Sequence, residues 1–404
     1  MRKTPTMLDS RVKHETSLAK VWEGRLKATK QVERGSSKDT GDASLVPSQS
    51  SCEQRSEKLP AKAGGVTQFV PVVSKTGKVL MPTTPCRAKQ LIKEGRAKKQ
   101  FRCGIFYIKM LDREDGDVQK VAVGIDPGSK REAYTVKSKS HTYLNVLSNA
   151  VDWVKDAVET RRIMRRSRRS RNTPYRMCRT NRSRKGIPPS TKARWQLKLR
   201  ISNILCKLYP ITDFVVEDVK AKTIKNGRKW NVSFSPLEVG KNWFYDEVRK
   251  LGELYLKSGW ETKELRDTAG LKKTSGKLKE VFSAHNVDSF VIANWLIGGN
   301  VCPDNTEMFK IDPIRFHRRQ LHYLQPSIGN FRKRYGSTIS LGIKKGSLVT
   351  HNRRGFCYVG GNTKGRLSLH NVSNGDLVCK NSRKDDVRFL SFNSFKCYRV
   401  LGNA

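Results

Sequence analysis

The feature that most constrains the fold is a short apolar run that ends in an acid and a turn. Residues 121–126, VAVGID, carry apolar residues up to Asp126, and Pro127-Gly128 then end the run. A second run, 133–136, is expected to pair with the first as a hairpin. A carboxylate at the end of a buried strand is costly unless it is paired or binds a metal. Asp126 therefore either opens a turn or belongs to a metal site that other acids complete.

Two more acids occur in comparable settings downstream. The segment 213–219, DFVVEDV, is predicted to be a buried strand that carries Glu217, with Asp218 on the opposite face because side chains alternate along a strand. The segment 276–295 is predicted to contain a helix in which His285 and Asp288, three positions apart, share a face. Three converging acids would form a metal site, and carboxylate oxygens are ligands that suit Mg²⁺.

The charge of the chain points to a polyanionic partner. Lys and Arg number 81 against 36 Asp and Glu, a net charge of +45, and nucleic acid is the commonest partner of such a chain. A membrane surface is the minor alternative, and no segment approaches the roughly 18 apolar residues of a membrane span. No secretory signal is evident at the N-terminus, although an organellar transit peptide stays an alternative. Nine cysteines without a CxxC pair fit a reducing compartment. We therefore expect a cytoplasmic, nucleoid-associated protein.

The densest charge lies mid-chain. The run from Arg161 to Lys185 follows a predicted helix and contains 12 basic residues and no acid. Such a run can be a solvated tail, but apolar residues interleave with it, and guanidinium groups suit bidentate phosphate contacts. We expect it to lie along a nucleic-acid backbone. The candidate contacts, including two in the later segment FRKRYGST, are Arg161, Arg162, Arg165, Arg166, Arg168, Arg169, Arg171, Arg176, Arg179, Arg182, Arg332 and Arg334.

Other elements follow from periodicity and turn residues. A hairpin is expected from Phe69, followed by a basic helix over 85–94 that Gly95 closes, and by a strand over 104–110. A helix is expected from Pro188 to about residue 208, a second helix through about residue 258, and a strand over 260–265, WETKEL. Beyond about residue 312, short apolar runs between Gly, Asn and Ser predict a basic, mostly β domain.

The order of these motifs resembles the split RuvC-type nuclease fold, and more closely the IsrB family of transposon-encoded, RNA-guided nickases related to IscB. The motifs are GIDPGS at 124–129, the RRxxRRSRRSR run, VVEDV at 215–219 and AHNVDSFVIAN at 284–294. The segment VLMPTTPCRAKQLIKEGRA resembles the family's N-terminal domain, with Val79 in place of a proline, and FRKRYGST with the β domain resembles its target-adjacent-motif-interacting region. Glu217 and His285 are 68 positions apart with no His-Asn-His pattern between them, which favours IsrB over IscB, whose chain carries an HNH domain there.

The resemblance implies a mixed α/β protein with an RNase H-like RuvC core assembled from split segments. The expected parts are a disordered, basic extension over 1–65, a small α+β domain over 66–115, RuvC segments over 118–150 and 188–225, an Arg-rich bridge helix over 151–187, a linker with the third RuvC segment over 226–310, and a C-terminal β domain over 311–404.

The resemblance also implies an activity. Asp126, Glu217, His285 and Asp288 would be catalytic: the three acids would hold two Mg²⁺ ions, with Mn²⁺ as a substitute, and His285 would orient or deprotonate the attacking water. A guide RNA (omega RNA) would pair with one strand of a double-stranded DNA target beside a flanking motif, and the displaced strand would be nicked by a monomeric ribonucleoprotein. The alternatives are a catalytically silent RNA-guided DNA-binding protein, a RuvC-type junction resolvase, and a structural RNA-binding protein, which would explain the charge but not the acids.

Overall fold

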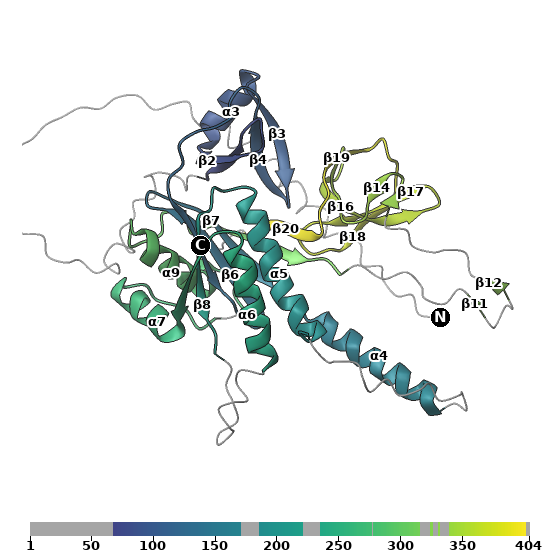
Figure 1. Ribbon diagram of the computed structural model, residues 1–404. Helices are drawn as coiled ribbons and strands as arrows, with labels where there is room; N and C mark the ends of the chain where they lie inside the picture. Colours follow the sequence, from purple (N-terminus) through teal and green to yellow (C-terminus); the bar gives the residue numbers. More distant parts are fainter. Residues whose placement is uncertain are drawn as a thin grey trace, which may run out of the picture. The chain divides into compact units, whose positions relative to one another are not determined.

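The computed structural model describes residues 68–170, 186–220, 235–276, 278–315, 324–325, 330–331 and 339–400 (Figure 1). The extension expected over 1–65 lies outside these residues. The described strands form a seven-stranded central sheet, a four-stranded sheet of N-terminal residues, a five-stranded sheet of C-terminal residues and two short strand pairs. Among the described helices, none combines the length and apolar character that a membrane-spanning segment requires.

The central sheet is mixed. Its strands, in spatial order, are β20 (Phe395–Val400), β10 (Met308–Pro313), β7 (Thr142–Asn149), β6 (Arg131–Ser138), β5 (Val121–Asp126), β8 (Asp213–Asp218) and β9 (Glu253–Ser258). The strands β5, β6 and β7 are antiparallel neighbours, whereas β8 and β9 run parallel to β5. When β5 to β9 are numbered 1 to 5 along the chain, their order in the sheet is 3-2-1-4-5. The strand β6 is antiparallel to the other four. This arrangement fits the RNase H-like core that the resemblance implies, and the strands expected at 121–126, 133–136 and 213–219 are confirmed.

Two strands extend this sheet beyond β7. The strand β10 runs parallel to β7 and pairs antiparallel with β20, with Ile311 opposite Cys397. Both of these side chains are buried in the main core. The strand β20 therefore joins the central sheet, although it comes from the segment 311–404 that the sequence assigns to a C-terminal β domain.

One face of the sheet packs against two helices. The side chain of Val123 on β5 is fully buried in a cluster with residues of α5 (Pro189–Cys206) and α6 (Pro236–Arg249). The helix predicted from Pro188 is confirmed, and its side chains Leu197, Ile201 and Leu205 are all buried. This cluster anchors β5 and thereby fixes the strand end that carries Asp126.

The opposite face of β5 is covered by α9 (Val287–Ile297). The helix passes so close that a Cβ on Gly124 would lie 1.8 Å from the backbone oxygen of Ser289. A glycine at position 124 is therefore required for this approach. The approach brings Asp288, in the first turn of α9, to the end of β5.

The N-terminal residues form a small α+β unit. Its four strands, in spatial order, are β2 (Val79–Thr83), β1 (Val70–Val73), β4 (Ile105–Met110) and β3 (Ala97–Arg102). The helix α3 (Pro85–Lys93) is capped by Thr84, whose side chain accepts a hydrogen bond from the Arg87 amide, and Gly95 follows it with φ of 74°. The predicted hairpin, helix and strand are confirmed, whereas β3 was not expected.

The C-terminal residues form an antiparallel sheet. Its strands, in spatial order, are β18 (Leu377–Ser382), β17 (Arg366–Asn371), β16 (Gly355–Thr363), β15 (Leu348–His351) and β19 (Val387–Ser391). The short pairs are β11 (Leu324–Gln325) with β12 (Asn330–Phe331), and β13 (Ile339–Ser340) with β14 (Ile343–Lys344). The mostly β character predicted for this part of the chain is confirmed.

The prediction of a strand over residues 260–265 is wrong. These residues belong to the helix α7 (Gly259–Thr268), the strand β9 precedes them, and the helix before β9 ends at Arg249. A capping box starts α7: the Ser258 side chain accepts from the Glu261 amide, and the Glu261 carboxylate accepts from the Ser258 amide. These two bonds satisfy backbone donors that a helix leaves open at its N-terminus, so the chain turns into a helix here.

The helix predicted within 276–295 is divided. It consists of α8 (Phe282–His285) and α9, with Asn286 between them. The buried Asn286 side chain donates to the carbonyl oxygens of Tyr134 and Val146, at 3.0 and 3.3 Å. The prediction that His285 and Asp288 share one helical face is therefore wrong, because they lie on different helices.

Candidate metal centre

Three acids from three separate elements meet at one edge of the central sheet. Asp126 ends β5, Glu217 lies near the end of β8, and Asp288 lies in the first turn of α9. One carboxylate oxygen of each lies within 4.8 Å of those of the other two. Among the described residues, these acids form the group whose geometry suits a metal ion, and it is the group that the sequence predicts.

The parallel pairing of β5 and β8 explains why two of these acids meet. Ile125 pairs with Val216, so the residues that follow, Asp126 and Glu217, lie side by side at the same end of the sheet. Asp218 points the other way, as predicted, and bonds to Lys241 of α6 at 2.7 Å. The first residue of α7 also abuts the site, since a Cβ on Gly259 would lie 2.9 Å from Glu217 Oε1.

Two basic side chains bind Asp288. The Arg266 guanidinium of α7 donates from Nη1 to Asp288 Oδ1 at 2.7 Å, and the Lys273 ammonium lies 2.5 Å from Asp288 Oδ2. The same ammonium is 3.8 Å from Asp126 Oδ2. The negative charges of Asp126 and Asp288 outweigh burial and raise the pKa of Lys273. No pattern in the sequence indicates Arg266 or Lys273 as a site residue.

The acids are difficult to ionise together. Burial, followed by the charge of Asp126, raises the pKa of Glu217 to about 8. Burial also raises the pKa of Asp126, to which the charge of Asp288 contributes while Lys273 opposes it. Metal-free, the site therefore retains a proton near neutral pH. A divalent cation would replace that proton and satisfy the carboxylates together, so this all-oxygen donor set fits Mg²⁺ or Mn²⁺.

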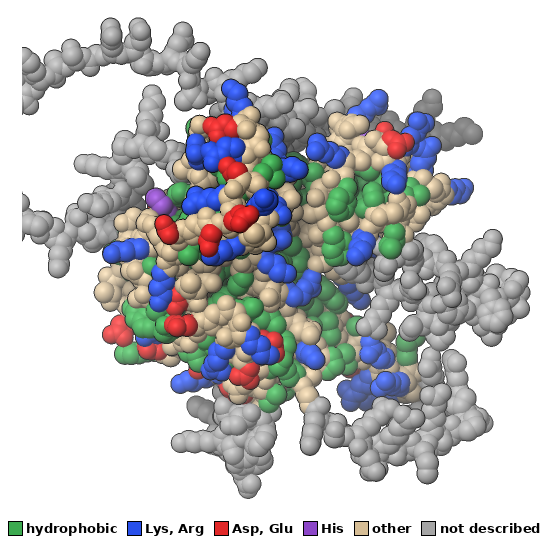
Figure 2. Space-filling model, turned by 45° about the horizontal axis from the view of Figure 1, so that its top comes forward, with side chains coloured by type: hydrophobic (Ala, Val, Ile, Leu, Met, Phe, Trp, Pro, Cys, Tyr) green, Lys and Arg blue, Asp and Glu red, His purple; other side chains and the backbone are tan. Residues whose placement is uncertain are grey.

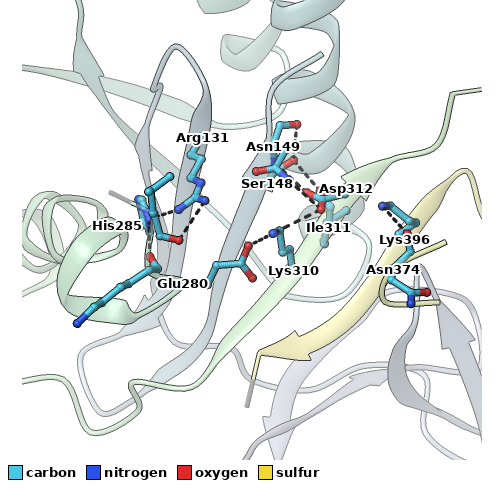
Figure 3. A network of polar contacts seen from close by, with 12 residues as sticks. Arg131, Ser148, Asn149, Glu280, His285, Lys310, Ile311, Asp312, Asn374 and Lys396 are labelled. Carbon is cyan, nitrogen blue, oxygen red and sulfur yellow. Dashed lines mark hydrogen bonds and ion pairs between the residues drawn. The ribbon is translucent and has the colours of Figure 1, made fainter. Parts of the chain in front are cut away.

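His285 is not a member of this group of acids. The Arg131 side chain donates from Nη1 to His285 Nε2 at 2.9 Å, and the same nitrogen is 3.0 Å from the Lys279 carbonyl oxygen (Figure 3). One nitrogen cannot accept from Arg131 and donate to a carbonyl at once. Because a guanidinium only donates, the consistent assignment is a neutral imidazole with an unprotonated Nε2. Burial and then the charge of Arg131 lower the pKa of His285, which agrees with this assignment.

A polar network ties the segment that precedes His285 to the central sheet. Glu280 forms an ion pair with Lys310 of β10, which also lies 3.7 Å from Asp312 (Figure 3). Asp312 in turn accepts from the backbone and side-chain amides of Asn149 on β7, at 2.9 and 3.0 Å. The position of His285 therefore depends on strands that are distant in sequence, and local patterns could not have indicated it.

A buried ion pair lies between the sheet and α5. Lys198 Nζ is 2.6 Å from Glu132 Oε1, and the Tyr134 hydroxyl donates to Glu132 Oε2 at 2.9 Å. All three side chains are almost completely buried. Burial raises the pKa of Asp126, and the charge of Lys198 is a smaller influence that opposes this rise.

The Arg-rich helix is α4 (Trp153–Ser170). The side chains of Arg161, Arg162, Arg165 and Arg166 are exposed, and together with Val158 and Pro189 they line a hollow of about 520 Å³. Arg168 and Arg169 lie on α4, but their side chains are not described. Arg171, Arg176, Arg179, Arg182, Arg332 and Arg334 lie outside the described residues. On the face drawn in Figure 2, Lys and Arg side chains are scattered over the described surface, while Asp and Glu form small groups.

The fold and the site define a mixed α/β protein with an RNase H-like sheet and a three-carboxylate centre at its edge. A family model described as RRXRR protein matches residues 70–233, and residues 165–169, RRSRR, have the pattern that this description spells. No curated protein matches the chain. Among solved structures, the chain is similar to T. thermophilus RuvC in complex with Holliday junction substrate, at 14% sequence identity and a TM-score of 0.25. That likeness covers 45% of this chain and 97% of the other.

Proposed function

We propose that this protein is a metal-dependent nuclease that nicks DNA under the guidance of an RNA. The observation that carries the proposal is the meeting of Asp126, Glu217 and Asp288, with ligand oxygens within 4.8 Å of one another. Acids held this close repel one another, and an arrangement that destabilises the fold is typical of a functional site. The net charge of +45 indicates that the substrate of this site is a polyanion such as a nucleic acid.

The three acids would hold Mg²⁺, or Mn²⁺ in its place. When bound, the metal would activate water and stabilise charge on the phosphate that is hydrolysed. Arg266 holds Asp288 from one side through Oδ1, which fixes the orientation of that carboxylate. The imidazole of His285 is neutral, and its Nε2 carries no proton. If Arg131 released this nitrogen, His285 could orient a water molecule or accept a proton from that water.

The nucleic acids would bind through basic side chains outside the centre. The exposed arginines of α4 offer guanidinium groups along one helix, a pattern suited to the phosphates of a guide RNA or its heteroduplex. Base pairing with the guide would select the target, and the C-terminal β sheet would read a short flanking motif on the DNA. The displaced strand would then be the flexible strand that reaches the carboxylates.

The proposal is tested with the protein and the RNA that co-purifies with it. We expect DNA cleavage that depends on this RNA and on Mg²⁺, and that a chelator abolishes. The Asp126→Ala variant should lose cleavage and keep RNA-guided DNA binding, because Asp126 lies at the end of β5 and not among the α4 arginines proposed to bind nucleic acid.

Three results would contradict the proposal in different ways. Undiminished cutting by Asp126→Ala would exclude this metal centre. RNA-guided binding without any cutting would identify a catalytically silent binding protein. RNA-independent cutting of four-way junctions would identify a junction resolvase.

A further inference from the structure

We propose that Lys273 is a built-in counter-ion of the carboxylate centre, which occupies the centre until a metal displaces it and thereby sets the metal affinity. The inference rests on the proposed function, since it requires a divalent metal to bind at these acids.

The geometry places the Lys273 ammonium where a cation would bind. It lies 2.5 Å from Asp288 Oδ2 and 3.8 Å from Asp126 Oδ2, so it bridges two of the three acids. A metal held by the same acids would need these oxygens. Ammonium and metal ion therefore compete for one position.

The two basic residues at Asp288 differ in how readily they can leave. Arg266 takes Oδ1, its side chain is 18% exposed, and it extends from the helix α7. Lys273 takes Oδ2, its side chain is 33% exposed, and it lies on the segment between α7 and α8. An ammonium on a four-carbon stem has no fixed bonding plane, whereas a guanidinium does. Lys273 is thus the exchangeable cation, and Arg266 the permanent one.

Backbone hydrogen bonds hold the chain on both sides of Lys273. The Leu271 amide donates to the Arg266 carbonyl at 3.1 Å, and the Thr274 amide donates to the Ser283 carbonyl at 3.0 Å. A displaced ammonium would therefore stay within one side-chain length of the centre. There it could bind an oxygen of the substrate phosphate, which brings a negative charge to the same place.

The charges of the Lys273 ammonium and of a divalent metal ion decide which of them binds the carboxylate oxygens. Three carboxylates face one exchangeable ammonium, and a divalent ion brings twice its charge to the same oxygens. Removing the ammonium deletes a repulsive neighbour of the incoming metal and leaves Arg266, among the described residues, as the one basic side chain that binds Asp288 in the metal-free state. Metal affinity should rise, and metal-free stability should fall.

The test is a Mn²⁺ titration of the full chain without DNA, at mildly alkaline pH, with free Mn²⁺ measured by electron paramagnetic resonance. We expect Lys273→Met to bind Mn²⁺ about tenfold more tightly than the unaltered protein, within the range usual for coupling between two ligands. Its melting temperature should be lower in chelator and should rise more on Mn²⁺ addition. If Lys273→Met does not fold, Lys273→Gln carries the same expectation.

Matched variants separate charge from general effects. Lys273→Arg keeps a cation and should bind Mn²⁺ much as the unaltered protein does, and Lys263→Met removes an exposed lysine of α7 and should change nothing. Equal Mn²⁺ affinity in Lys273→Met and the unaltered protein would overturn the role of Lys273 and leave the proposed function standing. Absence of Mn²⁺ binding in the unaltered protein and in Asp126→Asn alike would overturn the metal centre, and this inference with it.

Discussion

The proton that the metal-free acids retain has a consequence for stability. The pKa of Glu217 rises from 4.5 to about 8 in the folded chain, chiefly through burial and the charge of Asp126. Between these values the folded state holds a proton that the unfolded chain releases, so the free energy of unfolding falls as pH rises. We expect the melting temperature in chelator to fall over this range and Mg²⁺ to remove most of the decline. Glu217→Gln should show a shallower decline in chelator, and an identical slope in the two proteins would contradict the assignment.

Gly124 controls the site without contributing a functional group. A methyl group at this position would meet the Ser289 backbone oxygen at 1.8 Å, and a backbone atom cannot turn aside as a side-chain tip can. We expect Gly124→Ala to lower the free energy of unfolding by about 3 kcal/mol, at the upper end of the usual cost of overpacking, and to weaken Mn²⁺ binding because α9 carries Asp288. Denaturant unfolding and Mn²⁺ titration measure the two effects.

Gly361 on β16 provides the control for this substitution. Nothing lies within 4 Å of a Cβ placed on it, so Gly361→Ala should change stability by less than about 0.5 kcal/mol and leave Mn²⁺ binding intact. Equal behaviour of the two alanine variants would show that the approach of α9 does not position Asp288.

Secondary-structure elements differ in how far local sequence determines them. The strands β5 and β8 were predictable because apolar runs end in turns and acids, and both acids lie where these runs place them. The strand order follows from pairing between distant segments, and β20 joins the central sheet only through its contacts with β10. Ser258 and Glu261 have the Ser-x-x-Glu spacing of a capping box, a helix signal that the strand prediction over 260–265 did not include. The break at Asn286 depends on two carbonyl groups more than 100 residues away in sequence.

The residues of the candidate site also differ in how far the sequence indicates them. Carboxylates at strand ends carry a pattern that can be read from the sequence, whereas Arg266 and Lys273 are single basic residues in a chain that contains 81 of them. Their role follows from the distances to Asp288, which only the folded structure supplies. Arg131 is a comparable case, since its contact with His285 spans 154 positions.

The helix α4 can be tested as one element. Each lost phosphate contact should lower the slope of log affinity against log salt by about 0.7–0.9. Replacing Arg165, Arg166, Arg168 and Arg169 by Gln should therefore flatten the slope for guide RNA by up to about 3 units on the same counterion-release arithmetic. A double Gln variant of Arg249 and Lys250, whose side chains pair with acids of α6, should leave the slope nearly unchanged. An unchanged slope in the α4 variant would reduce this run to a solvated surface.

At the scale of the whole molecule, the number of carboxylate centres limits what the proposed nuclease can do. Within the described residues, one group of three acids has its ligand atoms close enough together for a metal. The segment between Glu217 and His285, which are 68 positions apart, contains α6, β9 and α7, which occupy much of the length that an inserted nuclease domain would need. The two scissile phosphates of a duplex lie on opposed strands, and one centre cannot hold both at once.

These limits predict a nick in the displaced strand alone. A centre at the edge of a sheet needs a strand flexible enough to bring its phosphate to Asp126, Glu217 and Asp288, and pairing with the guide leaves that freedom only to the displaced strand. The experiment uses a duplex labelled on each strand separately, with protein, guide RNA and Mg²⁺. We expect cutting of the displaced-strand label and an intact guide-paired label, with Asp126→Ala as the inactive control. Equal, guide-dependent cutting of both labels would require a second nuclease centre, and cutting of the guide-paired strand alone would reverse the proposed path of the DNA.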